Sequence, residues 1–251
     1  MFDEVGDRIF RRRYESLDQN IGVILGGESV CVIDSRSTHP DADELRGDLA
    51  RLTTLPVAFL VNTHMHWDHT FGNARFPEAV IVGHVDCRRR LLEEGEAARS
   101  RVQATEGFPE EIRQNLGSVE IVPPTVTFRN SIRLHLDDRT IELRWLGRGH
   151  TDNDIVVAVD GVCFAGDLVE EGAPPAFGDA YPEEWVTTLD LLLEDLAPTV
   201  VPGHGDVVDA DFVRAQRDEI AQAVGHLARD EGTAPWPSPV MDAIAARMTS
   251  R

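Results

Sequence analysis

Short apolar runs separated by polar and glycine residues dominate the first third of the chain. Runs of about four to eight apolar residues bounded by turn residues are typical of strands, and continuous runs indicate strands covered on both faces. One segment instead has helical spacing and follows residues that can cap a helix. The elements predicted here are strands over 20–25, 30–34, 57–62 and 79–83, and a helix over about 41–53 with Thr38 or Asp41 as its N-cap.

The pattern changes twice in the rest of the chain. Residues 86–116 are charged and helix-forming with few β-branched runs, which predicts two short helices; a helical flap over a functional site is one interpretation. Strand signals then return, and helices follow. The predicted elements are strands over 126–128, 132–136, 141–147, 154–159 and 162–166, a helix over 182–195, a strand over 199–203, a helix over 211–229, and a last helix after the 235–239 connector.

Two strand-rich halves, each followed by helices, predict an α+β fold with two sheets inside and helices outside, as a single domain over 1–251. A chain of this length buries enough surface to need no covalent staple. Its three cysteines, at 31, 87 and 163, form no disulfide framework. The first twenty residues lack the apolar core of a signal peptide, and no segment approaches 18 apolar residues. We therefore expect a soluble, cytoplasmic protein.

The charge limits the class of partner. The chain has 44 acidic and 24 basic residues, for a formal net charge of −20, and every basic residue is arginine, so lysine chemistry is excluded. Binding to a phosphate backbone depends on clustered cations, so we expect no nucleic-acid partner. The lack of a long apolar segment argues against a membrane partner, and a homo-oligomer is possible but not indicated. A small-molecule substrate is the expectation.

Four candidate metal ligands follow the predicted strand over 57–62. His64, His66, Asp68 and His69 form the pattern HxHxDH. Alternate side chains at an extended strand end point the same way, so His64 and His66 can meet one cation. Asp68 and His69 lie where the chain turns and can reach a second cation. Imidazole and carboxylate ligands suit Zn²⁺, and Fe or Mn also accept them.

Three further candidates follow other predicted strands, each beside glycine. His150 stands in the sequence GHT, Asp167 in AGD and His204 in PGHG. Glycine lets neighbouring backbone approach closely, so the adjacent side chain can be aimed at a ligand. Ligands collected from several strand ends make a rigid metal site, and these three residues complete the candidate site.

The motifs HMHWDH, GHT, AGD and PGHG, in this order, resemble those of the metallo-β-lactamase-fold hydrolases over about residues 8–210. The resemblance implies a four-layer αββα sandwich, with two mixed sheets and helices on the outside. It also implies two Zn²⁺ ions and a catalytic role for Asp68, which would orient the attacking water. The implied ligands are His64, His66 and His150 for one metal, Asp68, His69 and His204 for the other, and Asp167 as the bridge.

Departures from the family pattern limit which branch of the family the chain resembles. Asp167 replaces the cysteine ligand of some lactamase subclasses, and His66 stands where the flavo-diiron branch has glutamate. A C-terminal part of only 47 residues after His204 and the absence of lysine argue against glyoxalase II-like enzymes. Residues 20–34 and 149–169 look more similar to the β-lactamase-like and quinoprotein-relay-type branches.

We interpret the chain as a zinc-dependent hydrolase in which hydroxide generated between two metals attacks the activated carbonyl of a β-lactam, thioester, lactone or ester. Two alternatives stay open. One is a mononuclear iron persulfide dioxygenase of the same fold, and the other is a non-catalytic ligand-binding module. The complete ligand set favours the two-metal hydrolase, and the net charge disfavours a nuclease.

Residues beside the strand ends are candidates for supporting roles. Some could orient the imidazoles through hydrogen bonds, although capping explains each of them equally well. Trp67 and His84 are candidates for the substrate pocket, with core packing as the alternative for Trp67 and helix capping for His84. The four candidates for orienting the imidazoles are Asp34, Thr63, Thr151 and Asn153.

Overall fold

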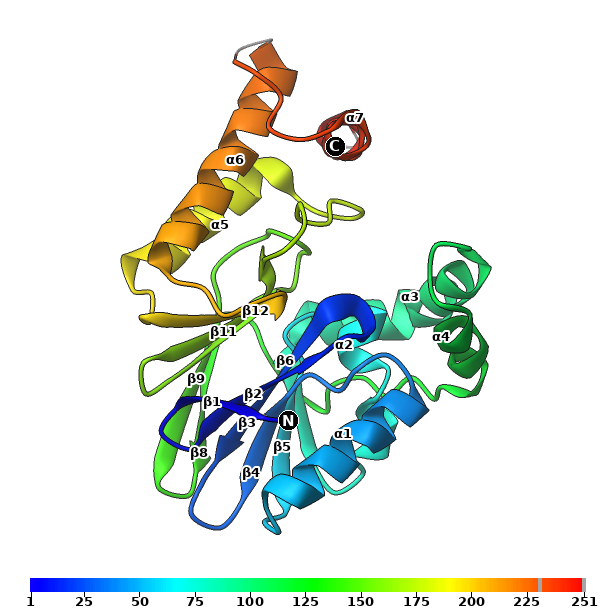
Figure 1. Ribbon diagram of the computed structural model, residues 1–251, viewed down its shortest axis with the longest axis vertical. Coiled ribbons are helices and arrows are strands. Elements are labelled where there is room, and N and C mark those ends of the chain that lie inside the picture. The colour runs from blue at the N-terminus through cyan, green and yellow to red at the C-terminus, as the bar shows by residue number, and fades with distance from the viewer. Residues whose placement is uncertain (230–231, 250–251) are drawn as a thin grey trace.

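The structure, a computed structural model, describes residues 1–229 and 232–249 (Figure 1). Strands of the first half are β1 (Asp3–Gly6), β2 (Ile9–Tyr14), β3 (Gln19–Leu25), β4 (Val30–Ile33), β5 (Val57–Val61), β6 (Val80–His84) and β7 (Val126–Phe128). Those of the second half are β8 (Ser131–Leu136), β9 (Arg139–Trp145), β10 (Ile155–Val159), β11 (Val162–Glu170) and β12 (Thr199–His204).

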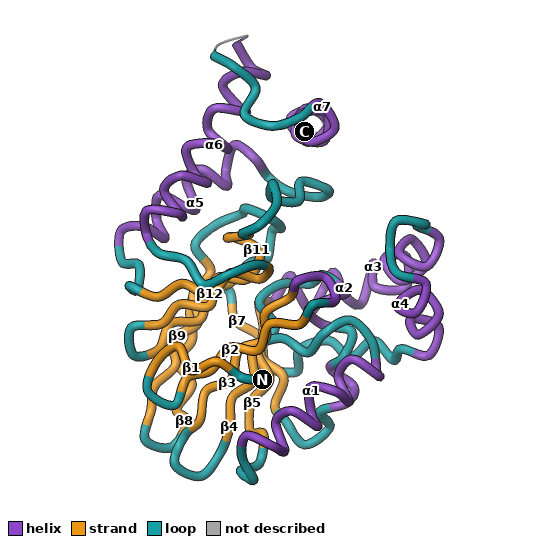
Figure 2. Tube along the Cα trace, viewed as in Figure 1, coloured by secondary structure: helices purple, strands orange, loops and turns teal. Residues whose placement is uncertain are grey.

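Helices lie on both sides of the strands (Figure 2). They are α1 (His39–Leu52), α2 (Trp67–Thr70), α3 (Val85–Ala104), α4 (Glu110–Asn115), α5 (Pro182–Glu194), α6 (Ala210–Arg229) and α7 (Ser238–Thr249), with short 3₁₀ turns η1 (Ser16–Asp18), η2 (Asn73–Arg75) and η3 (Leu116–Ser118). None of these helices, in the part of the chain that the structure describes, combines the length and the apolar character needed to cross a bilayer.

Strand pairing joins the two halves at a single seam. The hydrogen-bonded order is β7-β6-β5-β4-β3-β12-β11-β10-β9-β8, with β2 beside β3 and β1 beside β2. The strands β4 to β7 are parallel, as are β11 and β12, and the remaining pairs are antiparallel. At the seam His204, the last residue of β12, pairs with Gln19, the first residue of β3. The carboxyl end of β12 is therefore held against the first half.

The first sheet is covered on both faces, as the apolar runs predict. All four side chains of β4 are buried. Val30 and Val32 pack in the cluster that contains Leu45 and Leu49 of α1, whereas Cys31 and Ile33 face the other way, into the cluster between the sheets. Successive side chains of a strand point to opposite faces of the sheet. A sheet covered by a helix on one face and by the second sheet on the other therefore requires apolar residues at every position.

The second sheet repeats this arrangement in β11. Phe164 packs between the sheets, and Cys163 and Ala165 pack on the outer face with Trp185 of α5. Helices α5, α6 and α7 lie on this side of the molecule, and α1, α3 and α4 lie on the other (Figure 1). The predicted four-layer αββα arrangement is confirmed.

The two largest differences between the structure and the sequence prediction lie in the segments 86–116 and 9–14. The first helix of 86–116 is not short, because α3 runs for 20 residues and buries Leu91 and Val102 on one face. The charged segment 9–14 is a strand that the apolar pattern does not reveal. Its arginines are compatible with pairing because they form ion pairs at the strand edge, among them Arg13 with Asp18 and Arg12 with Asp48. Elsewhere, the helix over 41–53 begins at His39 with Thr38 as its N-cap.

The approach of the two sheets depends on Gly22 in β3. A methyl group added there would lie 2.5 Å from Cε1 of Phe164 and 2.9 Å from Cδ1 of Ile33, both in the core between the sheets. We expect Gly22→Ala to lower the free energy of unfolding by about 1–3 kcal/mol, because an overpacked core must shift to admit it. Equilibrium urea unfolding measures this change. Gly27→Ala, in the turn after β3 with its nearest atom at 3.8 Å, is the control, and equal losses in both variants would contradict the prediction.

Candidate metal centre

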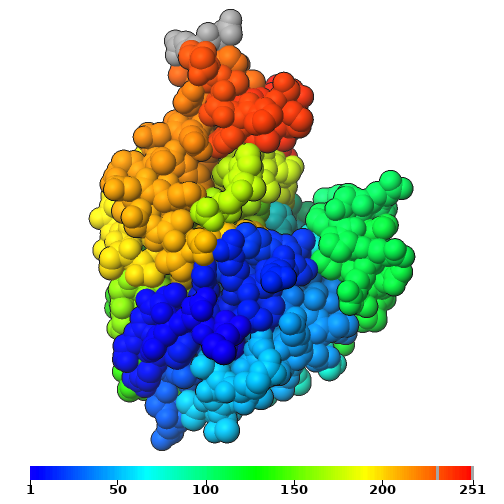
Figure 3. Space-filling view, in the orientation of Figure 1, coloured from blue at the N-terminus to red at the C-terminus, as the bar shows by residue number. Residues whose placement is uncertain are grey.

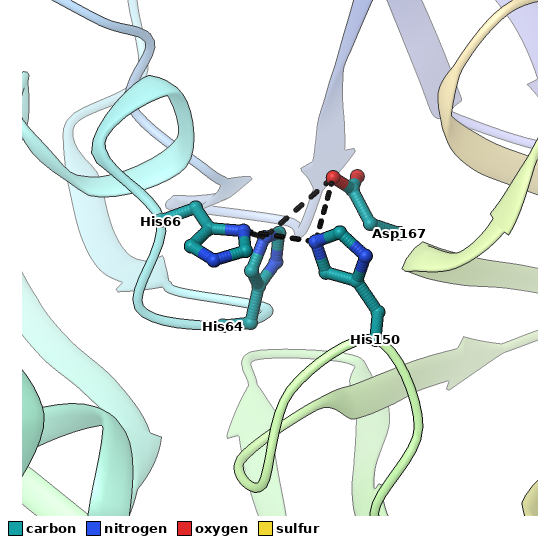
Figure 4. A group of neighbouring side chains, drawn as sticks. All are labelled: His64, His66, His150 and Asp167. Carbon is teal, nitrogen blue, oxygen red and sulfur yellow. Dashed lines mark hydrogen bonds and ion pairs between the residues drawn. The ribbon is translucent and has the colours of Figure 1, made fainter. Parts of the chain in front are cut away.

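The candidate ligands predicted from the sequence come together at the ends of strands from both sheets. His64 and His66 lie in the turn after β5, and His69 lies in the one-turn helix α2. His150 follows β9, and Asp167 lies within β11 (Figure 4). Two groups of side chains result. The first contains His64, His66, His150 and Asp167, the second contains Asp68, His69 and His204, and the ligand atoms within each group lie within 4.8 Å of one another.

In the first group, three imidazoles and one carboxylate face a common point (Figure 4). Nδ1 of His66 lies 2.8 Å from Nε2 of His150 and 3.1 Å from Nε2 of His64. Oδ2 of Asp167 lies 3.4 Å from Nε2 of His150 and 3.6 Å from Nε2 of His64. Ligand atoms about 2.0–2.1 Å from a tetrahedral ion lie about 3.3–3.4 Å apart, so this spacing suits a small divalent cation.

The second group has similar spacing and shares Asp167 with the first. Oδ2 of Asp68 lies 3.4 Å from Nε2 of His69 and 3.3 Å from Nε2 of His204. The two imidazole nitrogens are 3.3 Å apart. Asp167 turns Oδ1 toward His69, at 3.2 Å, and Oδ2 toward His204, at 3.4 Å. The carboxylate of Asp167 therefore lies between the two groups.

Asp167 also provides a test of whether a cation fits. Its Oδ1 is buried and forms no hydrogen bond within the described residues. Its nearest charged neighbour is Nε2 of His69 at 3.2 Å. A buried carboxylate oxygen that accepts no hydrogen bond is costly, and a metal ion is one of the few groups that satisfies it. A side chain at position 203 would collide with this oxygen, so glycine there is required for the close approach of β12.

The other ring nitrogen of each histidine is bound by the protein. This is the arrangement by which proteins fix the tautomer and the ring orientation of metal-binding histidines. The partners are Thr63 Oγ1 for His64 Nδ1, Asp179 Oδ1 for His66 Nε2, Asp34 Oδ2 for His69 Nδ1, the Ala176 carbonyl for His150 Nδ1 and the Leu17 carbonyl for His204 Nδ1.

Electrostatics also favour a cation at the centre. Burial lowers the pKa of His64 well below its usual value and that of His150 to about 4, so both rings are neutral and able to bind metal. Burial would also lower the pKa of His69 and His204. The nearby aspartates, of which Asp167 has the largest effect, instead raise the pKa of both rings well above the usual value. Without a metal the carboxylates thus hold protons on two histidines, and a divalent cation would replace this positive charge.

Two of the four residues predicted to orient the imidazoles do contact them. Asp34 accepts hydrogen bonds from the backbone and the hydroxyl of Thr63 and from His69, each at 2.8 Å. Thr151 and Asn153 form a local turn instead: the hydroxyl and backbone N–H of Thr151 bind Asp154, and the N–H of Asn153 binds the Thr151 hydroxyl. Within the described chain, neither is hydrogen-bonded to a histidine.

Of the two residues predicted to line the substrate pocket, one lies on the cavity and the other does not. Trp67 lines the cavity above the centre and packs edge-to-face with Phe108 at 5.2 Å. His84 does not line this cavity. It caps α3 by accepting from the Asp86 N–H, binds the Arg129 carbonyl and stacks on Trp145, which is the capping alternative.

The cavity opens between the helical segment 85–118 and the segment after β11, where the surface is notched (Figure 3). It has a volume of about 870 Å³ and reaches both groups of ligands. Met65, Trp67, Val102 and Phe108 form an apolar wall. Charged residues on the lining include Arg90, Arg101, Glu94, Glu170 and Asp179. Residues 86–116 thus contribute one wall of the cavity.

Sequence reasoning missed Asp179 and Glu170. Asp179 binds His66, and Oε1 of Glu170 lies 3.5 Å from Nδ1 of His150. Burial raises the pKa of Glu170 to about 8. Asp179 lies in a segment without regular structure, so no strand end or periodicity marks it. Glu170 ends β11, three residues after Asp167, and that position was the only available signal.

The sequence model of the metallo-beta-lactamase superfamily matches residues 15–204, most of the chain. The chain belongs to this superfamily. A protein named metallo-beta-lactamase type 2 from Bacteroides fragilis is 28% identical over 108 residues, which are 40% of this chain and 43% of that protein. The match thus spans less than half of the length of the Bacteroides fragilis protein.

Solved structures of metallo-beta-lactamases have the same fold. The enzyme from Pontibacter korlensis superposes with a TM-score of 0.69 at 18% identity, over 88% of this chain and 98% of that one. FIM-1 from Pseudomonas aeruginosa, in its mono-zinc form, gives 0.68 at 18% identity, over 89% and 95% of the two chains. At these identities the similarity shows the architecture alone. The sequence model over residues 15–204 confirms the superfamily predicted from the motifs.

Asp34 offers a test of how the second group is oriented. We expect Asp34→Asn to weaken Zn²⁺ binding by about 10–100-fold, because an amide nitrogen replaces one of the oxygens that accept from Thr63 and His69. Competition with a chromophoric chelator measures the affinity. Asp137→Asn is a matched control, since Asp137 also has positive φ and accepts two backbone N–H groups, from Glu28 and Ser29. Unchanged affinity in Asp34→Asn would refute the assigned role.

Proposed function

We propose that the protein is a zinc-dependent hydrolase that holds two metal ions and acts on the activated carbonyl of a small molecule. The observation that carries the proposal is the pair of His/Asp groups that share Asp167 at the floor of an open cavity. His64, His66 and His150 would hold one ion, and Asp68, His69 and His204 the other. When bound, such ions polarise a carbonyl oxygen and make water acidic enough to ionise near neutral pH.

Asp68 is the residue that orients the attacking water in this proposal. Its carboxylate lines the cavity. Burial alone would raise its pKa, but the imidazoles of His69 and His204 hold it well below the usual value. The ionised carboxylate can therefore accept a hydrogen bond from a water molecule. This contact orients the water so that a lone pair on its oxygen points toward the carbonyl carbon of the substrate. Its backbone carbonyl is held by the side chain of Gln19, which fixes the residue in place.

The size and the lining of the cavity favour a small substrate with both apolar and polar parts. Its volume of about 870 Å³ lies in the usual range for small-molecule sites, about 300–1,000 Å³. The apolar wall at Trp67 and Phe108 suits the body of such a molecule and keeps water from that side. A β-lactam, thioester, lactone or ester meets these requirements. The net charge of −20 supports a small molecule over a nucleic acid.

The second ligand group separates this proposal from its alternatives. A mononuclear iron persulfide dioxygenase would leave one buried group of histidines and aspartates without a cation, at an electrostatic cost. A non-catalytic binding module would not require the converging imidazoles. The complete second group, Asp68, His69 and His204, therefore favours a dinuclear hydrolase.

Metal content tests the proposal directly. We expect two zinc ions per chain by mass spectrometry, because two groups of ligands are complete. His204→Ala and His64→Ala should each reduce the content by about one ion and abolish hydrolysis. His135→Ala is the control, because His135 is an exposed residue of β8 whose side chain bonds, among the described residues, to the Thr140 hydroxyl. One iron per chain, with oxygen uptake in the presence of a persulfide, would overturn the hydrolase in favour of the dioxygenase.

The role of Asp68 is tested separately. We expect Asp68→Asn to reduce kcat at least about 100-fold, because an amide is a poor acceptor for the proton of the attacking water. The assay is hydrolysis of a panel of a chromogenic cephalosporin, a thioester, a lactone and a p-nitrophenyl ester. Asp43→Asn, in an exposed ion pair with Arg75, should keep full activity. Full turnover by Asp68→Asn would show that Asp68 does not orient the water.

A further inference from the structure

Asp179 binds His66, one of the candidate ligands of the first group. Its Oδ1 accepts a hydrogen bond from Nε2 of His66 at 2.9 Å. The opposite nitrogen, Nδ1, faces His64 and His150 (Figure 4). A proton held on Nε2 by the carboxylate leaves the Nδ1 lone pair free, so Asp179 determines which nitrogen of His66 can bind a metal.

No regular element fixes the position of Asp179. It lies between β11 and α5, in a segment from 171 to 181 with no helix or strand. An irregular segment holds a carboxylate in place only if other parts of the protein bind it. Other residues of the segment are hydrogen-bonded to the rest of the protein, and Ala176 and Tyr181 are two examples. The N–H of Ala176 donates to Glu170 at 3.0 Å, and the N–H of Tyr181 donates to the Gly149 carbonyl at 2.8 Å.

The C-terminal helix supplies the contact next to Asp179 itself. Arg247 of α7 donates from Nε to the Ala180 carbonyl at 2.8 Å and from Nη2 to the Asp179 carbonyl at 3.1 Å. A planar guanidinium that binds two successive carbonyls fixes both peptide units at once. Helix α7 lies on the side of the molecule formed by α5 and α6 (Figure 1), far along the chain from His66.

The side chain of Asp179 has a second neighbour in α3. Nη2 of Arg90 lies 3.5 Å from Oδ2 of Asp179, and Arg90 also pairs with Asp152 and Glu94. This contact occupies the carboxylate oxygen that does not bind His66. The carboxylate is therefore held from both sides, by the backbone contact from α7 and by the charge from α3.

We propose that Asp179 is a positioning residue for His66, and that Arg247 of α7 holds Asp179 in place and so contributes to metal affinity at the His64, His66 and His150 group. The proposal rests on the proposed function insofar as this group binds a metal. The superfamily sequence model ends at residue 204. Arg247 lies beyond it, so this support belongs to a part of the chain that the common pattern does not describe.

The test is Zn²⁺ and Co²⁺ affinity of the full chain, measured by competition with a chromophoric chelator. Asp179→Ala should weaken one of the two bound ions by about 10–100-fold and leave the other unchanged, as expected for loss of a group that orients a single histidine. Asp179→Asn, which keeps the size and one acceptor oxygen, should give a smaller loss. The absorption bands of Co²⁺ should change with the weakened site.

Arg247→Ala should weaken the same ion several-fold. Arg217→Ala is the matched control, since Arg217 joins α6 to α5 through two hydrogen bonds to Asp190 and does not line the cavity. If Arg247 acts through Asp179, its substitution adds no further loss in the Asp179→Ala background. Losses that multiply in the double variant would show that Arg247 acts elsewhere and would overturn its part of the proposal.

Other outcomes are also decisive. Wild-type affinity for both ions in Asp179→Ala would overturn the positioning role while leaving the proposed function intact. Equal weakening of both ions, with a lower thermal midpoint of the metal-free protein, would indicate general destabilisation and also refute it. Wild-type protein that takes up no metal would overturn the proposed function and this proposal together.

Discussion

Three buried carboxylates, those of Asp34, Asp68 and Asp167, determine much of the architecture of this protein. Their ion pairs in the described structure are with imidazoles alone. Removing a carboxylate from water costs several kcal/mol unless charge and hydrogen bonds replace the solvent. The converging histidines meet part of this need, and a metal ion would meet the rest. Compensation is least complete at Oδ1 of Asp167, which accepts no hydrogen bond within the described residues and has only the ion pair with His69.

This need explains why the centre is built from both sheets. No single strand can bring enough imidazoles to one point, because alternate residues face opposite sides. The seam between β12 and β3 places His204 against the loop after β5, and the core between the sheets fixes their separation. Gly22 and Gly203 contribute in the same way, since a side chain at either position would collide with a neighbouring side chain, Phe164 at Gly22 and Asp167 at Gly203. The metal site is thus rigid because the core is.

The sequence predicts the parts of the site that depend on local chain geometry. His64, His66 and His150 follow apolar runs and glycines, so their positions can be read from the pattern. Asp179 cannot be predicted in this way, because it reaches His66 from an irregular segment across 113 residues of chain. Thr151 has the local capping role that the sequence left open, because its hydroxyl binds the nearest acceptor, which is Asp154. Strand β2 was missed because its arginines hide the alternation, and ion pairs supplied by distant segments make it stable.

The absence of lysine has a structural consequence. A lysine ammonium is a point charge, whereas a guanidinium presents several donors in one plane and can bind two acceptors in fixed geometry. Arg247 uses this property on two successive carbonyls, and Arg90 uses it to pair with carboxylates from three segments. In a chain with net charge −20, such contacts fasten irregular segments that the apolar core does not cover. The orientation of His66 therefore depends on cations that lie outside the metal centre, as well as on the ligands within it.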